Sequence, residues 1–265
     1  MLLTLLLMPA ALVGIDVEKF MDIRPGTIPI IVSAPHGGRQ EIPGVPLRVG
    51  GNTVKKFVTV LDTNTLELAE ALIPAIENEF GGKPYIVFAR FTRKQIDANR
   101  PAEDSYENSH AKPYYDAYHK ALLEACRDIR KTWGGGLLLD LHAQAKTSDL
   151  IYRGTQNLKT VKLLKDRFGM AAITGPNSLL GQMSGKGYGI FPPIADPADA
   201  AEFPSYSGGW IVGRYGADSG TGLDAIQLEI GARFRTNKTI PKTAADLAAG
   251  LKVFSTAYLP QERRK

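Results

Sequence analysis

The sequence predicts an α/β protein with the architecture of a three-layer αβα sandwich. Short apolar runs alternate along the 265-residue chain with segments whose apolar residues recur every three or four positions. Several of these runs are apolar throughout, which is typical of strands in a sheet that is covered on both faces. The hydrophobic fraction of 44% and the charged fraction of 22% are ordinary globular values, and they supply enough apolar material for one sizeable core.

The predicted strands are apolar runs bounded by glycine, proline or polar residues. The first run leads into Ser33-Ala34-Pro35-His36-Gly37-Gly38, and the third ends at His142. The last run carries Glu229 in otherwise apolar surroundings. Strands are predicted at 28–34, 85–91, 136–142, 149–152 and 225–230.

The predicted helices lie between these strands. In the first one, Leu66, Ala69 and Ile73 follow helical spacing, and Asp62 or Thr63 is a candidate N-cap. Helices are predicted at 62–80, 113–131, 158–168 and 243–258. Two stretches, 44–54 and 175–222, read as irregular, and the aromatic residues of the second predict an ordered wall of a pocket.

Charge and cysteine content exclude several function classes. The net charge of +5 is mild and its basic residues are scattered, and no nucleic-acid-binding signature is present, so we expect no nucleic-acid partner. A basic balance favours an anionic small-molecule substrate such as a carboxylate. The single cysteine, Cys126, excludes an internal disulfide framework and reads as a buried structural thiol in a helix.

The N-terminal residues 1–14 are almost wholly apolar, but they are too few to span a bilayer. Their length and small residues fit the hydrophobic part of a secretory signal, although a basic n-region is missing. A buried N-terminal segment is the alternative. We therefore expect no stable membrane span, export to the periplasm or the medium if the signal functions, and a cytoplasmic location otherwise. Residues 15–265 then form one catalytic domain, and its oligomeric state has no signal in the sequence.

Two of the four histidines end predicted core strands, and this indicates a metal site. A hydrolytic zinc ion needs about three protein ligands of N or O type and one open position for water. His36 and His142 supply two. The third is Asp62, which opens the helix after the first histidine loop, or Glu41, five residues after His36. Asp140 shares a strand face with His142 and is a candidate partner that orients it, or a ligand itself.

Two further segments carry candidate chemistry. Asn99 and Arg100 adjoin Pro101, and an arginine fork matches a carboxylate in two-point fashion; a surface turn with an ordinary salt bridge is the alternative. Burial would raise the pKa of Glu229 towards that of a general base beside metal-bound water. A structural ion pair of Glu229 with Arg233 or Arg235 is the other interpretation.

Taken together, these motifs resemble the N-formylglutamate amidohydrolase family over residues 28–236. The resemblance rests on Ser33-Ala34-Pro35-His36-Gly37-Gly38-Arg39, Asp62, Asp97-Ala98-Asn99-Arg100-Pro101, Asp140-Leu141-His142 and Leu228-Glu229-Ile230. It implies a zinc-carboxypeptidase-like fold, with a mixed, mostly parallel sheet between helices and zinc above the strand ends. It also implies that His36, His142 and Asp62 hold the zinc, that Glu229 is catalytic, and that Asn99 and Arg100 grip a substrate carboxylate. The His-x-x-Glu pattern of carboxypeptidases is absent, because Arg39 stands three residues after His36.

The predicted function is zinc-dependent hydrolysis of a non-peptide C–N bond in an N-acyl (N-formyl-like) amino acid or a small peptide-like amide that carries a carboxylate. Zinc would activate water, Glu229 would move the proton, and Arg93 or Arg100 would steady the oxyanion. Arg93 is also a candidate for binding the substrate, together with Asn99 and Arg100. One alternative is a binding domain that retains the fold without catalysis. A zinc carboxypeptidase or cell-wall peptide amidase is another. The last is a metal-independent hydrolase that uses Ser33 or Cys126, for which the Gly-x-Ser-x-Gly elbow is missing.

Overall fold

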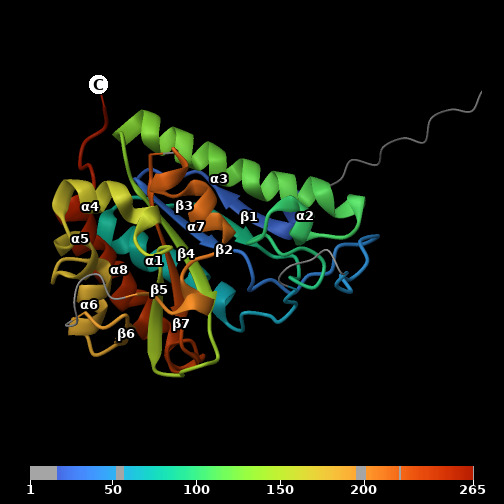
Figure 1. The fold of residues 1–265 in the computed structure, drawn as a ribbon. Helices are drawn as coiled ribbons and strands as arrows, with labels where there is room; N and C mark the ends of the chain where they lie inside the picture. Colours follow the sequence, from blue (N-terminus) through green and yellow to red (C-terminus); the bar gives the residue numbers. More distant parts are fainter. Residues whose placement is uncertain (1–16, 52–56, 195–200, 221, 265) are drawn as a thin grey trace, which may run out of the picture.

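The computed structural model of the protein describes residues 17–51, 57–194, 201–220 and 222–264. Within these ranges one seven-stranded sheet lies between helices on both of its faces (Figure 1). The predicted α/β class with three layers is therefore confirmed. The segment 1–14 and the export signal predicted for it lie outside the described residues. No helix in the described ranges has the length and apolarity needed to cross a membrane.

The sheet is mixed and mostly parallel, as predicted. Its strands are ordered β1-β3-β2-β4-β7-β5-β6, and only the β1–β3 and β5–β7 pairs are antiparallel among the described strands. The strands are β1 (Met21–Arg24), β2 (Ile30–Ala34), β3 (Tyr85–Ala89), β4 (Leu137–Ala143), β5 (Leu150–Gly154), β6 (Gly189–Phe191) and β7 (Asp224–Ile230). All five predicted strands are present. Two more, β1 and β6, were not predicted because runs of three or four residues carry too little periodicity.

The helices are α1 (Thr65–Phe80), α2 (Ala102–Ser105), α3 (Lys112–Trp133), α4 (Lys162–Phe168), α5 (Ala171–Thr174), α6 (Leu179–Gly185), α7 (Trp210–Tyr215) and α8 (Ile240–Tyr258). The prediction that 175–222 is irregular is wrong at α6, β6 and α7, each of which has seven residues or fewer. Residues 195–200 and 221 of that stretch lie outside the described ranges. Its segment 204–209 does line a cavity, in agreement with the predicted pocket wall.

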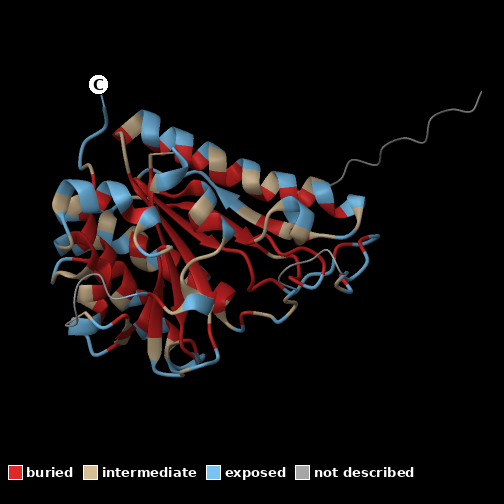
Figure 2. Ribbon diagram, viewed as in Figure 1, coloured by how far each residue is buried: buried red, intermediate tan, exposed pale blue. Residues whose placement is uncertain are grey.

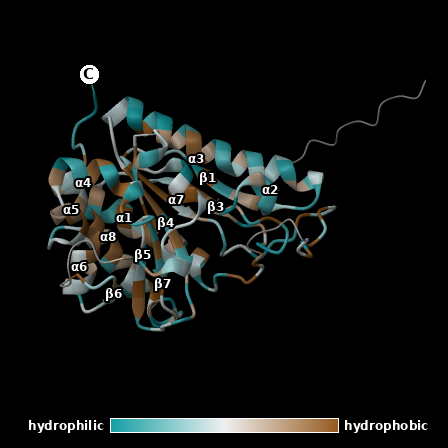
Figure 3. Cartoon of the chain, viewed as in Figure 1, coloured by the Kyte–Doolittle hydropathy of each residue, from teal (hydrophilic) through white to brown (hydrophobic). Residues whose placement is uncertain are grey.

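Each face of the sheet has its own apolar core. Side chains of α1, α6 and α8 share one cluster with Leu137, Leu139 and Leu141 of β4, whereas those of α3 and α7 share the other with Leu138. This alternation along one strand is the period-two pattern of a sheet covered on both sides. Figure 2 shows the inner strands buried between helices whose outer faces are exposed, while the edge strand β1 is partly exposed, and Figure 3 shows many residues of the inner strands as hydrophobic.

The α3/α7 face changes from apolar to polar towards the carboxyl ends of β2, β4 and β7. Its apolar end holds Ile31, Leu138 and Ala225. The register then pairs Ser33 with Asp140, Asp140 with Gln227, and His142 with Glu229. The polar side chains in this region are all buried: Ser33, Asp140, His142, Gln227 and Glu229. Because buried polar groups are costly unless they are paired or functional, this end of the sheet is where a site is expected.

A different buried carboxyl group, at the start of β7, makes stability depend on pH. Burial raises the pKa of Asp224 to about 7, while one of its oxygens accepts a hydrogen bond from Leu164 N at 3.0 Å. The folded state then binds more protons than the unfolded state between about pH 4 and pH 7, so its stability falls as pH rises through that window.

Asp224→Asn removes this titration and keeps an oxygen acceptor for Leu164. We therefore compare the free energies of unfolding of the variant and of the unaltered protein. Between pH 4 and pH 8, their difference should change by roughly 2–4 kcal/mol in favour of the variant. Denaturant unfolding at several pH values measures the difference. The exposed Asp149→Asn is the control, and parallel pH profiles for Asp224→Asn and the unaltered protein would contradict the assignment.

Candidate metal centre

His36 lies immediately after β2 on a loop that packs against the start of α1. A β-carbon on Gly37 would come within 2.5 Å of the backbone nitrogen of Leu66, so only glycine permits this close approach. The loop is tied to the segment before α1, because Asp62 N donates a hydrogen bond to His36 O at 3.2 Å. The motif thus brings Asp62 next to His36 across 26 positions of sequence.

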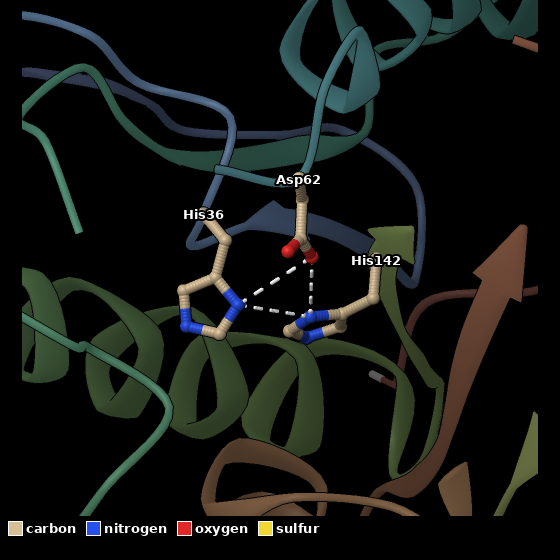
Figure 4. A group of neighbouring side chains, drawn as sticks. All are labelled: His36, Asp62 and His142. Carbon is tan, nitrogen blue, oxygen red and sulfur yellow. Dashed lines mark hydrogen bonds and ion pairs between the residues drawn. The ribbon is translucent and has the colours of Figure 1, made fainter. Parts of the chain in front are cut away.

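Three donor atoms from three elements converge at this point (Figure 4). His36 Nδ1 lies 3.1 Å from His142 Nδ1, and Asp62 Oδ2 lies 3.5 Å from the former and 3.2 Å from the latter. Three ligands at the corners of a zinc tetrahedron, each about 2.0–2.1 Å from the ion, are separated by about 3.3 Å. The donor set, its spacing and its burial therefore fit a zinc ion.

The outer nitrogens of both histidines face carboxylates. His36 Nε2 lies 2.6 Å from Asp97 Oδ1, and His142 Nε2 lies 2.8 Å from Asp140 Oδ2. When each Nε2 donates its hydrogen to its carboxylate, each Nδ1 presents a lone pair. Three acceptors then point at one another, an arrangement that a bound cation satisfies. Carboxylate–histidine pairs of this kind orient the ligands of protein-bound metals.

The pKa values of His142 and Asp62 also indicate that this cluster of side chains favours a bound positive charge. Burial by itself would lower the pKa of His142, but the neighbouring carboxylates of Asp140 and Asp62 outweigh burial and raise it well above its usual range. Burial would raise the pKa of Asp62, yet its hydrogen bonds to His142 and His36 hold it well below its usual range. The surroundings therefore stabilise a cation beside a permanently ionised carboxylate.

Arg93 ties the ligands together from behind. Its Nε and Nη2 both donate to Asp97 Oδ2, at 3.0 and 2.8 Å, and its Nη1 lies 3.5 Å from Asp62 Oδ1. Against the opposing effect of burial, His36 and Arg93 lower the pKa of Asp97. Arg93 was predicted to bind substrate or the oxyanion. The structure instead engages all three of its nitrogens with the protein, Nη1 also reaching Val60 O.

Asn99 is held by both ends of its amide. Its Oδ1 accepts from Ile211 N at 2.8 Å, and its Nδ2 lies 3.2 Å from His142 Nε2 and 3.4 Å from Gln227 Oε1. A β-carbon on Gly209 would overlap the Asn99 side chain, so any other residue there would displace the Asn99 amide. Asn99 was predicted to bind a substrate carboxylate. In the structure it lies beside His142, a candidate metal ligand, and beside Gln227, which contacts the candidate base Glu229.

Glu229 lies in the same cavity, which has a volume of about 650 Å³. Burial raises the pKa of Glu229 to about 7, and its Oε1 accepts a hydrogen bond from Gln227 Nε2 at 2.8 Å. The alternative ion pair of Glu229 is formed with neither arginine: Arg233 is exposed, and the Arg235 guanidinium donates to the carbonyls of Ile230, Thr63 and Gln144. A carboxyl group with this pKa can gain and lose a proton near neutral pH.

Arg100 also borders the cavity, and its donors are only partly used. Its Nη1 donates to Asn99 O at 2.7 Å. Its Nε is buried without a hydrogen-bond partner and lies 4.0 Å from Asp97 Oδ2. A buried donor that lacks a partner carries an energetic cost which a bound anion would remove.

The remaining candidates lie elsewhere or have other partners. Glu41, the competing third ligand, is exposed, and Asp62 is not the N-cap of α1, since Asn64 holds that position. Cys126 is free and buried, lines a different cavity, and has its pKa raised to about 12 by burial. Ser33 Oγ donates to Asp140 Oδ1 at 2.5 Å. Neither side chain is placed as a nucleophile.

Two contributors were not predicted as site residues. Asp97 belongs to a motif that sequence analysis quoted without giving this residue a role, and Gln227 was not singled out. Gln227 stands two residues before Glu229, so strand alternation places both on one face, and that signal was available in the sequence. No sequence signal relates Asp97 to His36, because 61 residues separate them.

Comparison with known proteins bears on the fold. No family model matches the sequence, and no curated protein matches it either. Among solved structures, N-formylglutamate amidohydrolase from Ralstonia eutropha JMP134 superposes with a TM-score of 0.58 at 16% identity, covering 90% of this chain and 97% of that one. A gene product from Agrobacterium tumefaciens gives a TM-score of 0.55 at 14% identity, covering 91% and 95%. The family resemblance in the sequence is thus confirmed at the level of architecture: the chain has the fold of N-formylglutamate amidohydrolase.

Proposed function

We propose that this protein is a zinc-dependent amidohydrolase that cleaves the amide bond of an N-acyl amino acid or a similarly small amide bearing a carboxylate. The observation that carries the proposal is the convergence of three buried acceptors, from His36, His142 and Asp62, beside Glu229 in one cavity. The fold shared with a solved N-formylglutamate amidohydrolase supports the choice of amide hydrolysis.

The metal would be held by the two Nδ1 atoms and Asp62 Oδ2, with Asp97 and Asp140 fixing the orientation of the histidines. When bound, zinc would supply a Lewis acid that polarises the scissile carbonyl and lowers the pKa of water to about 7. Ala143 N donates to Asp62 Oδ2 at 3.1 Å and so holds that carboxylate in place. The rigid surroundings mean that the ligands need little rearrangement when the ion binds.

Glu229 is assigned the proton transfers. Its carboxylate removes a proton from the attacking water as the new C–O bond forms. The proton then passes to the leaving nitrogen as the C–N bond breaks, giving a carboxylic acid and an amine. Gln227 holds one oxygen of Glu229, which leaves the other available to the substrate side of the cavity.

We assign the binding of the substrate carboxylate to Arg100, because this side chain borders the cavity and has unused hydrogen-bond donors. Arg100→Ala is expected to raise KM by about 10² with a smaller loss in kcat, since an arginine–carboxylate contact is lost in substrate and transition state alike. Arg100→Lys should recover only part of this loss, because lysine lacks the fork. Steady-state kinetics measure the effect. A fall in kcat at constant KM would instead place Arg100 at the reacting carbonyl.

Metal analysis of the purified protein combined with an activity screen tests the proposal. We expect about one zinc per chain, hydrolysis of N-acyl amino acids, loss of that activity with a chelator and its return on adding Zn²⁺. Release of the free amine is the readout. Zinc-loaded protein that binds such substrates without hydrolysing them would support the non-catalytic alternative. Activity insensitive to the chelator would exclude the metal mechanism.

A further inference from the structure

The lining of the cavity has a polar part, called the pole below, and a group of apolar side chains, called the rim. The pole is formed by the three metal-ligand candidates, Glu229 and Arg100. The rim contains Val58, Val60 and Leu61 from the segment before α1, together with Pro204 and Tyr206 from the segment before α7. Val60 is 72% exposed. Apolar side chains that border a cavity with a few convergent polar groups are typical of a small-molecule site.

Exposed apolar side chains gather on the first of these segments. Among the described residues, four of the eight large hydrophobic residues that are exposed fall between positions 47 and 60: Leu47, Val49, Phe57 and Val60. On the second segment, the Tyr206 ring lies 5.0 Å from that of Tyr152 and 5.5 Å from that of Phe203, measured between centroids. This support gives the Tyr206 side of the rim a defined position.

Among the residues that the structure describes, few cationic side chains border this cavity. Three arginines border the cavity among its described lining residues. Arg93 is engaged by Asp97 and Asp62, and Arg235 by three backbone carbonyls. Arg100 is the one with donors to spare. Within the described lining, the site therefore provides for one substrate carboxylate.

We infer that the substrate carries one carboxylate, bound by Arg100, and a neutral apolar substituent that packs against Val60 and Tyr206. This inference rests on the proposed function and narrows its substrate class. Among the described lining residues, a second carboxylate against the rim would meet hydroxyl groups such as those of Ser205 and Tyr206 but no unengaged cation, so its lost hydration would be only partly compensated. It would also share the cavity with the acidic groups of Asp62 and Glu229. An apolar group instead buries the exposed valine and the tyrosine ring.

The test compares two substrates whose side chains have similar length, N-formyl-L-norleucine and N-formyl-L-glutamate, on zinc-loaded protein. We expect kcat/KM to favour the norleucine compound by at least about tenfold. Calorimetric binding to the zinc-loaded Glu229→Gln variant should show the same order of affinity without turnover. A tenfold preference for the glutamate compound would overturn the inference and leave the proposed function intact. Tighter binding of the norleucine compound with no hydrolysis by the unaltered protein would do the reverse.

Val60→Lys locates the effect on the rim. Because this valine is mostly exposed, lysine is expected to be tolerated and to supply the missing cation, shifting the ratio of the two kcat/KM values about tenfold towards glutamate. Val49→Lys is the matched control, since Val49 is 83% exposed in the same segment and does not border the cavity. Tyr206→Ala should raise KM for the norleucine compound about tenfold and leave KM for the glutamate compound nearly unchanged. Equal shifts of the kcat/KM ratio in Val60→Lys and Val49→Lys would show that the rim does not set the substrate preference.

Discussion

Replacing His36 with alanine is expected to abolish stoichiometric zinc binding and to lower turnover by at least about a thousandfold. The substitution removes one of three converging acceptors, leaving His142 and Asp62 as an incomplete set. It also removes the contact of the Asp97 carboxylate with His36 Nε2, 2.6 Å away, and leaves Asp97 bonded to Arg93 and to Asn99 N. Zinc content after dialysis and initial rates with added Zn²⁺ measure the two effects.

Graded variants make this prediction sharper. Asp97→Asn keeps the ligands but weakens the carboxylate that orients His36, so metal affinity should fall about 10–100-fold rather than disappear. Glu41→Gln alters the exposed carboxylate that sequence analysis offered as a ligand, and it should bind zinc normally. Full zinc content in His36→Ala, or loss of zinc in Glu41→Gln, would show that the metal is held elsewhere.

Glu229→Gln is expected to retain zinc and to lose turnover by about 10²–10⁴. Glutamine preserves the shape of the side chain and an oxygen that can accept from Gln227, but it cannot take a proton from water. Zinc content, KM and kcat distinguish this outcome from unfolding. A variant with unchanged kcat would place the general base at another residue.

The pH dependence gives the same residue a second test. Since burial raises the pKa of Glu229 to about 7, the protonated and inactive form should dominate on the acidic side of neutrality. Activity of the unaltered protein therefore rises with pH through this region, and the rise should be absent from the residual activity of Glu229→Gln. Glu41→Gln is the matched control, and it should keep the unaltered profile.

The parts of the fold that sequence predicted are those with long, unambiguous patterns. The apolar runs that became β2, β4 and β7 are buried on both sides, so most of their positions carry the signal and only the site residues interrupt it. The helical stripe of α3 extends over 22 residues. By contrast, β6 has three residues and α7 has six, and tertiary contacts rather than local pattern decide their conformation.

The candidate site divides in the same way. The histidines and Glu229 were recognisable because a polar residue at the end of an apolar strand is unusual. Roles that depend on which atom faces which partner could not be recognised from the sequence. Arg93 and Arg100 stand seven positions apart in one polar segment, yet Arg93 is bonded to Asp97 while Arg100 retains free donors.

The sequence by itself therefore determined the α/β class, the strands that end at the site, and the residue types suited to a zinc hydrolase. The tertiary structure decided the rest: Asp62 rather than Glu41 beside the histidines, Asp97 behind His36, and apolar side chains in the lining of the same cavity as Arg100. The physical reason is the parallel register of β2, β4 and β7. It brings His36 and His142, 106 positions apart, to 3.1 Å between their Nδ1 atoms and pairs His142 with Glu229, and no local pattern encodes such distances.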